Sequence, residues 1–304
     1  MSRAWLGGGG PLLAIGGAED KLGSKGILSR FVKLAGGPAA RIVVLSTASS
    51  LGDEATAVYR ELFSQFGVTD VRGLRPVTRG EANQPACSEL VADATGIFMT
   101  GGNQGKLSQV VSGTRLGDAI ANAHDRGAVV GGTSAGASAL SQHMVSFGAE
   151  GATPKHRMVH LAAGLGLLPG VIVDQHFGER NRYGRLLALV AASPSLVGLG
   201  IDEDTAALVG PDGTFEVLGR GSVLVVDGTH VESNAFEARR SQPIMVSGAV
   251  LHTLPAGFRF SLAERRLVTS LKVVSDDVAP APVTPRAGRR IAAEGAGTRR
   301  RDSS

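Results

Sequence analysis

The sequence predicts an α/β fold built on a parallel β-sheet with helices on both faces. Short apolar runs, mostly β-branched, alternate with segments of helical periodicity through the first three quarters of the 304 residues. Each apolar run ends in a turn or polar signal, as buried parallel strands do. Strands that alternate with helices imply βαβ units and a covered sheet. The predicted strands of this part are 11–15, 41–45, 96–99, 128–130 and 171–173.

The predicted helices occupy the gaps between these strands. Apolar residues with the spacing of one helical face are Ala55, Val58, Tyr59, Leu62 and Phe66. Similar periodicity predicts helices over 114–125 and 180–192, and small residues favour a short helix over 135–140.

Beyond about residue 197 the pattern changes from alternating elements to strands joined by mostly short connections. The turn signal Gly-Pro-Asp-Gly at 210–213 separates two of them. We expect a C-terminal β meander appended to the sheet, with strands over 197–201, 206–209, 214–218, 222–226 and 249–254.

The domain organisation follows from composition. We expect a single catalytic domain over 1–276 and a disordered tail rich in Pro, Ala and Arg over 277–304. The tail holds six arginines against three acidic residues, so it carries +3 of the formal net charge of +4. The body is therefore near neutral, and nucleic-acid binding through it is not expected.

Other function classes are excluded by what the sequence lacks. The single cysteine, Cys87, rules out an internal disulfide and zinc sites built from several cysteines of one chain. A buried or incidental thiol is the preferred interpretation of Cys87. The apolar runs are too short for a membrane span, and the N-terminus lacks the apolar core of a signal peptide. We therefore expect a cytoplasmic protein without membrane association.

The strongest functional signal is the pentapeptide Gly-Thr-Ser-Ala-Gly at 132–136, which follows an apolar strand and precedes a helix. This is the strand–turn–helix context in which a sharp elbow presents a nucleophilic serine, here Ser134. The backbone N–H of Ala135 would lie at a helix N-terminus and could stabilise an oxyanion. A glycine-rich turn that merely packs closely or holds a phosphate is the alternative.

A nucleophilic serine needs a base and an orienting carboxylate. Among seven histidines, His176 follows the strand 171–173, at the strand end where open α/β sheets bind ligands. Three acids follow the strand 197–201 and are not distinguished by the residues alone: Asp202, Glu203 and Asp204. The chain order of serine, histidine and acid differs from the serine, acid, histidine order of α/β-hydrolases, which argues against an ordinary esterase or lipase.

Several motifs make the sequence resemble the peptidase E and cyanophycinase family of serine peptidases, over about residues 11–260. The Asp-Gln-His-Phe block with its following arginines is the most specific of them. The motifs are GGAEDK at 16–21, STASS at 46–50, TGGNQ at 100–104, GGTSAGA at 131–137, DQHF at 174–177, Arg180, Arg182, GRL at 184–186 and GIDEDTA at 200–206.

The resemblance implies a fold like that of class I glutamine amidotransferases, usually as a homodimer, with no metal and no cofactor. It implies a triad of Ser134, His176 and Glu203, with Ala135 and Gly102 at the oxyanion hole. It also suggests pocket residues, namely Gln104, Asp174, Gln175, Arg180, Arg182 and Arg185. The implied activity is exopeptidase hydrolysis of cyanophycin, a poly-aspartate with arginine on each β-carboxyl, to β-Asp-Arg dipeptides through an acyl-enzyme.

Chemistry supports such a pocket, because arginines bind carboxylates in bidentate fashion and an acid could receive a guanidinium. Structural ion pairs among the same residues are the alternative. Three other functions stay open: a peptidase E-like dipeptidase acting on Asp-initiated peptides, a non-catalytic binding protein of the same fold, and a nucleic-acid-associated protein acting through its basic tail.

Overall fold

The computed structural model describes residues 9–268, so the predicted tail at 277–304 lies outside the described residues. The helical segments begin and end as follows: α1 Gly26–Ala35, η2 Gly37–Ala39, α2 Asp53–Ser64, α3 Arg79–Ala82, α4 Pro85–Ala92, α5 Gln104–Val111, α6 Arg115–Asp125, α7 Ala135–Ala139 and α8 Tyr183–Ala192. The strands are β1 Leu12–Ile15, β2 Arg41–Leu45, β3 Asp70–Leu74, β4 Gly96–Met99, β5 Val129–Thr133, β6 His143–Gly148, β7 Val159–Ala163, β8 Val171–Gln175, β9 Val197–Ile201, β10 Thr205–Val209, β11 Thr214–Gly219, β12 Ser222–Asp227, β13 Glu232–Ser233, β14 Val246–Ser247, β15 Val250–Pro255, β16 Arg259–Ser261 and β17 Arg266–Leu267.

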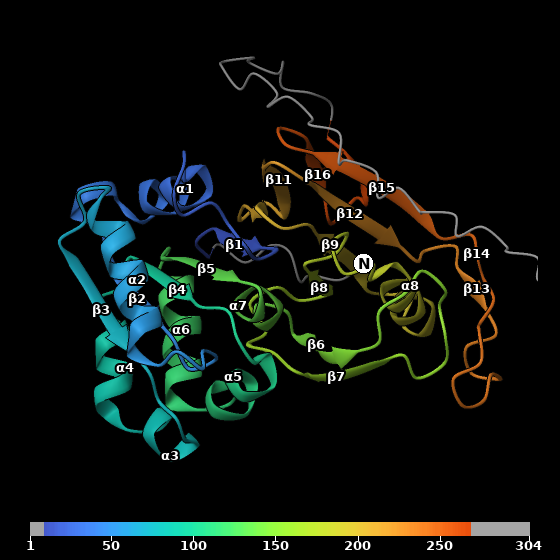
Figure 1. Ribbon diagram of the computed structural model, residues 1–304, viewed down its shortest axis with the longest axis horizontal. Helices are drawn as coiled ribbons and strands as arrows, with labels where there is room; N and C mark the ends of the chain where they lie inside the picture. The colour runs from blue at the N-terminus through green and yellow to red at the C-terminus, as the bar shows by residue number, and fades with distance from the viewer. Residues whose placement is uncertain (1–8, 269–304) are drawn as a thin grey trace, which may run out of the picture. The chain divides into compact units, whose positions relative to one another are not determined.

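The main sheet has nine strands in the order β17-β16-β11-β10-β1-β5-β4-β2-β3. Its five strands from β1 to β3 are parallel, and four of them, β1, β2, β4 and β5, are strands that the sequence predicts. The four strands on the other side of β1 are antiparallel and extend the same sheet (Figure 1).

Helices cover both faces of the parallel part, and the period of two along each strand explains how. On β1, Leu13 and Ile15 pack with α1 and α2, whereas Leu12 and Ala14 face the core that holds α4, α5, α6 and α7. Helix α1 ends where Gly36 adopts a left-handed conformation, with φ 114°, which glycine tolerates without a steric penalty. The prediction of helices on both faces is confirmed.

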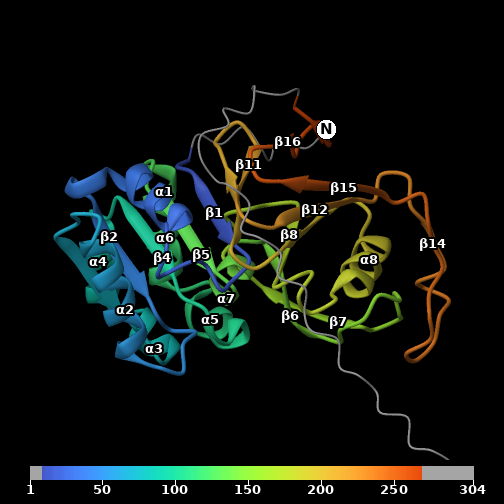
Figure 2. The same cartoon turned by 45° about the horizontal axis from the view of Figure 1, so that its top comes forward.

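The strands after residue 197 form as predicted, but they do not make one meander. A second sheet of four strands, in the order β15-β12-β9-β8, takes β9, β12 and β15, whereas β10 and β11 join the nine-stranded sheet. The chain crosses between the two sheets because β9 extends β8 in parallel and β10 pairs antiparallel with β1. Figure 2 shows α8 beside this second sheet, with the hairpin of β6 and β7 below it. That hairpin and β3 are elements that the sequence analysis missed. So are the helices α1, α3, α4 and α5 and the short strands β13, β14, β16 and β17.

The two sheets meet at the carboxyl ends of β1, β5, β8 and β9. The N–H of Ser134, after β5, donates to the carbonyl of Ile15 at 2.9 Å, and the N–H of His176, after β8, donates to the carbonyl of Gly16 at 2.7 Å. The N–H of Phe177 donates to the carbonyl of Ile201 at the end of β9, at 3.1 Å. Turns from three strands are thereby tied together at one edge, where open α/β sheets bind their ligands.

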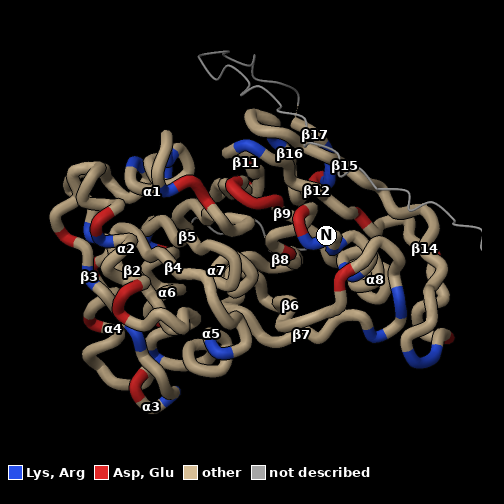
Figure 3. The backbone as a smooth tube through the Cα atoms, viewed as in Figure 1, with Lys and Arg blue, Asp and Glu red and all other residues tan. Residues whose placement is uncertain are grey.

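Two further features concern charge and hydropathy. Basic and acidic residues are interspersed along residues 9–268 rather than segregated (Figure 3). Over the same residues, none of the helices has the length and apolar character that crossing a membrane requires.

Candidate active site

The sharpest backbone feature of the site is Ser134, between β5 and α7, with φ 52° and ψ −109°. A side chain in this region costs free energy, and such residues concentrate at functional sites. The flanking glycines allow the close packing around it: a Cβ on Gly132 would lie 2.3 Å from the carbonyl carbon of Gly136, and a Cβ on Gly136 would lie 2.4 Å from the carbonyl oxygen of Met99. The strand, sharp turn and helix predicted around the serine are therefore present.

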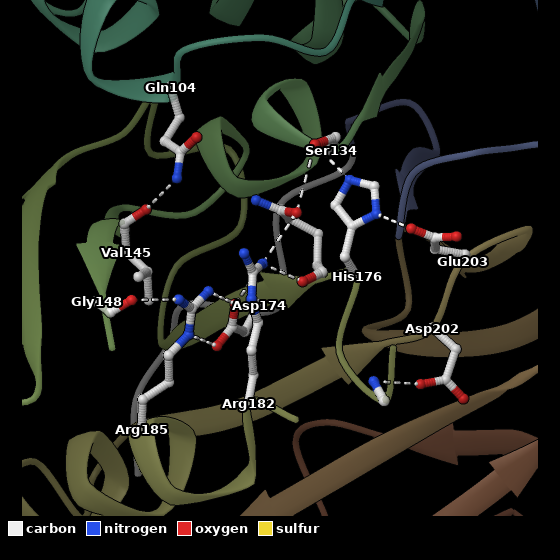
Figure 4. A network of polar contacts seen from close by, with 12 residues as sticks. Gln104, Ser134, Val145, Gly148, Asp174, His176, Arg182, Arg185, Asp202 and Glu203 are labelled. Carbon is white, nitrogen blue, oxygen red and sulfur yellow. Dashed lines mark hydrogen bonds and ion pairs between the residues drawn. The ribbon is translucent and has the colours of Figure 1, made fainter. Parts of the chain in front are cut away.

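The imidazole of His176 lies between the serine and a carboxylate (Figure 4). Its Nε2 is 3.0 Å from Ser134 Oγ, and its Nδ1 is 2.5 Å from Glu203 Oε1. With the proton on Nδ1, the ring donates to Glu203 and accepts the serine hydroxyl proton at Nε2. This is the hydrogen-bond order that a general base requires.

Backbone geometry decides between the three acids that follow β9. Asp202 turns away and accepts N–H groups from Gly178 and Ser222, both at 3.0 Å. Asp204 accepts from the N–H of Asp20 at 2.7 Å and from Arg220 Nε at 2.6 Å. Only Glu203 of the three reaches the imidazole in the described structure.

The ionisation of His176 reflects its partly buried position. Burial lowers the pKa of His176 below its ordinary value, the hydrogen bond that the ring donates to Glu203 raises it, and the charge of Arg180 lowers it again. The net effect is a lowered pKa. The imidazole is therefore mostly neutral near pH 7, as a group that takes a proton from serine must be.

Backbone donors lie beside the serine on two sides. Ala135 begins α7, and the first N–H groups of a helix have no partner within the helix. The Gly101-Gly102 turn follows β4 on the other side: a Cβ on Gly101 would lie 3.4 Å from Ser134 Cβ. Gly102 has φ 140° and packs so closely that an added Cβ would lie 2.1 Å from the carbonyl oxygen of Ala48.

An open cavity of about 390 Å³ adjoins this turn, and it is lined by Ala48, Ser50, Gly102, Asn103, Gln104 and Ser146. The side chain of Gln104 donates from Nε2 to the carbonyl of Val145 at 3.2 Å, which ties α5 to the missed hairpin. Ser50 and Asn103 fell within recognised motifs, but Ser146 lies in a hairpin that no sequence signal indicated.

A buried polar cluster lies behind the serine, and it uses most of the predicted pocket residues. Arg185 binds Asp174 in bidentate fashion, through Nε to Oδ2 at 2.6 Å and through Nη2 to Oδ1. Arg182 Nη1 donates to the carbonyl of Gln175 and to its Oε1, the latter at 3.1 Å, and lies 3.5 Å from Asp174 Oδ1. Gln175 Oε1 is 3.4 Å from Ser134 Oγ.

The predicted role of Arg182 and Arg185 as holders of substrate carboxylates is not what this structure provides. Their side chains are only 7% and 3% exposed, and that of Asp174 only 1%. Burial and the neighbouring arginines lower the pKa of Arg182 to about 10, against the attraction of Asp174. These residues form structural ion pairs, the alternative raised by the sequence. Arg180, by contrast, is exposed and close enough to influence His176.

The comparisons with known proteins identify the family of the chain and agree with its fold. Residues 12–217 match the model of peptidase family S51, which is more than half of the chain, so the chain belongs to this family and is a serine-type peptidase. Cyanophycinase from Thermosynechococcus vestitus is 40% identical over 255 residues, 83% of this chain and 79% of the relative. Cyanophycinase from Nostoc sp. is 38% identical over 266 residues, 87% of this chain and 89% of the relative.

Among solved structures, a peptidase from an acI-B1 Actinobacterium superposes with a TM-score of 0.60 at 22% identity. The match covers 80% of this chain and 98% of that one. At this identity the likeness supports the fold alone.

Proposed function

We propose that this peptidase hydrolyses cyanophycin, with Ser134 as nucleophile, His176 as general base and Glu203 as the carboxylate that orients the imidazole. The observation that carries the triad is the continuous chain of contacts from Ser134 through His176 to Glu203, at 3.0 and 2.5 Å. The substrate class is supported by relatives named cyanophycinase that are about 40% identical over most of the chain.

The reaction follows from this arrangement. His176 Nε2 takes the hydroxyl proton as Ser134 Oγ attacks a backbone carbonyl of the poly-aspartate, and the N–H groups of Ala135 and Gly102 stabilise the oxyanion. The C–N bond then breaks, and the leaving amine takes the proton from His176. Water, deprotonated by the same imidazole, hydrolyses the acyl-enzyme and restores the serine.

Recognition of the substrate rests on the accessible groups. The exposed guanidinium of Arg180 is available for a substrate carboxylate, and the cavity beside Gln104 offers polar surface for a branch. The buried ion pairs of Asp174 support the floor of the site, because their charges are already satisfied by each other. A branch held in the cavity keeps its own amide away from Ser134, so the backbone amide is cleaved and β-Asp-Arg dipeptides are released.

The test is incubation of purified cyanophycin with the wild type and the Ser134→Ala variant, followed by mass analysis. We expect β-Asp-Arg dipeptides from the wild type. The folded variant should lose turnover by about three or more orders of magnitude. Free arginine with bare poly-aspartate would show that the branch amide is cleaved instead. Cleavage of short Asp-initiated peptides but not of cyanophycin would favour a peptidase E-like dipeptidase, and no cleavage of either would favour a binding protein.

Cytoplasmic location and homodimeric assembly are further proposals that rest on the composition and on the family resemblance. Sedimentation of the purified chain at several concentrations tests the assembly directly.

A further inference from the structure

A buried carboxylate that is not part of the triad contacts the residue before Ser134. The side chain of Glu19, four residues after β1, is only 1% exposed and binds three donors. The hydroxyl of Thr133 donates to Oε2. The hydroxyl of Tyr59 on α2 donates to Oε1 at 2.5 Å, and Lys21 Nζ lies 2.8 Å from the same oxygen.

The contact between Glu19 and Thr133 lies at the end of a strand that leads into the active site. Thr133 is the last residue of β5 and directly precedes Ser134. The ladder between β5 and β4 ends at Gly132, so on that side Thr133 has no strand partner, and on the other side it pairs with Ile15 of β1. The hydrogen bond to Glu19 is therefore an additional restraint on the residue that leads into the strained turn.

Glu19 also belongs to the turn that covers the imidazole. Two residues before it, Gly17 packs against His176, and the carbonyl of Gly17 accepts the N–H of Asp204 at 2.8 Å. One short turn thereby contacts the elbow through a side chain and the histidine through its backbone. Neither contact is used by the proton transfers described above.

We propose that Glu19 is a positioning residue, which maintains the distance between Ser134 and His176 by holding Thr133 to the turn that covers the imidazole. This inference rests on the proposed roles of Ser134 and His176. Burying a carboxylate is costly unless donors satisfy it, and Glu19 has a full set of them. Burial and the charge of Glu19 raise the pKa of Tyr59 well above its usual range, so the phenol remains a donor at every pH of interest.

The experiment compares Thr133→Val with Thr133→Ser. Valine keeps the shape of threonine and removes the hydroxyl, whereas serine keeps the hydroxyl. We expect Thr133→Val to lower kcat by about ten- to a hundredfold, as a misplacement of a few tenths to 1 Å does, with KM within about twofold. Thr133→Ser should restore most of kcat. The rate at which a fluorophosphonate labels Ser134 should fall in parallel with kcat.

The matched control is Thr56→Val on α2. Thr56 is buried, and its hydroxyl donates to Ser46 Oγ at 3.0 Å, away from Glu19. We expect Thr56→Val to lower the melting temperature comparably and to leave kcat per folded molecule unchanged. Glu19→Gln combined with Thr133→Val should lower kcat no further than the more damaging single change, because both act through one contact.

Three results would overturn the inference: a kcat for Thr133→Val within twofold of the wild type, an equal loss of kcat in Thr56→Val, or no rescue by Thr133→Ser. The acid limb of the pH profile gives a further criterion, because the main causes of the lowered pKa of His176 do not include Glu19. The limb should keep its midpoint in Thr133→Val, and a shifted midpoint would count against a purely positional role. Retained activity in Ser134→Ala would instead refute the proposed function, so the two failures are distinguishable.

Discussion

Replacement of Gly17 by alanine should impair catalysis in addition to its cost to folding, because the added methyl group would occupy the space of the imidazole. A Cβ built on Gly17 would lie 2.2 Å from Cε1 and 2.4 Å from Nε2 of His176. Ordinary contact begins at 3.4 Å. The ring must therefore retreat by about 1 Å, a displacement that is large on the scale of catalytic geometry.

The expected loss of kcat follows from the position of His176 Nε2. This atom is 3.0 Å from Ser134 Oγ, so a retreat of about 1 Å lengthens the contact beyond hydrogen-bond distance. A misplacement of this size costs about 100-fold in rate, equivalent to about 2.7 kcal/mol of transition-state stabilisation. Gly17 also has φ 104°, so alanine there adds backbone strain of about 1–3 kcal/mol to the cost of folding.

The assay measures kcat and the melting temperature of Gly17→Ala beside a matched variant, Gly127→Ala. Gly127 has φ 102°, nearly the same as Gly17, but an added Cβ there would meet nothing within 4 Å. It lies before β5, at the end remote from the active site. Both variants should lose comparable stability, and only Gly17→Ala should lose about 100-fold in kcat.

Two results would refute this reasoning. If kcat of folded Gly17→Ala stayed within threefold of the wild type, contact between Gly17 and the imidazole would not control the catalytic geometry. If Gly127→Ala lost as much kcat as Gly17→Ala, general backbone strain would explain both. The labelling rate of Ser134 by a fluorophosphonate provides an independent measure of the same geometry.

Two further predictions concern charge. In a pH profile of kcat/KM, the acid limb reports the protonation of His176. Glu203→Gln removes the interaction that raises the pKa of His176, so it should move the acid limb to lower pH. Arg180→Gln removes a charge that lowers this pKa, so it should move the acid limb to higher pH. For stability, Asp174→Ala leaves Arg185 buried without its carboxylate, so it should lower the free energy of unfolding in urea by about 3–5 kcal/mol.

The substitutions of Arg180 and Asp174 each have a control. Because Arg180 is exposed, its effect on the limb should shrink as salt is added, and a salt-independent shift would contradict an electrostatic cause. For Asp174→Ala the comparison is Arg266→Ala, whose partner Glu264 lies 2.9 Å away on the surface. Breaking this exposed pair should change the urea midpoint little. Equal effects of the two substitutions would show that burial does not set the cost.

Local patterns were sufficient to identify most of the longer strands, four of the helices (α2, α6, α7 and α8) and the elbow, because these depend on residues close together in the chain. Alternation of apolar runs and helical periods indicated the parallel sheet, and the glycines around Ser134 indicated a sharp turn after β5. The predicted apolar face on α2 was correct for Tyr59 and Leu62, whereas Val58 is 46% exposed, because spacing alone does not fix the width of the buried face.

The tertiary structure decided everything that depends on contacts between distant segments. The residues of strands β9, β10 and β12 are all strand-like, and only pairing across the chain assigns them to two different sheets rather than one meander. Likewise, Arg180, Arg182 and Arg185 are chemically identical in the sequence. Arg182 and Arg185 lie buried near Asp174, whereas Arg180, in the turn before α8, is exposed. The sequence alone thus determined which chemistry is available, and the packing of distant elements determined which groups can use it.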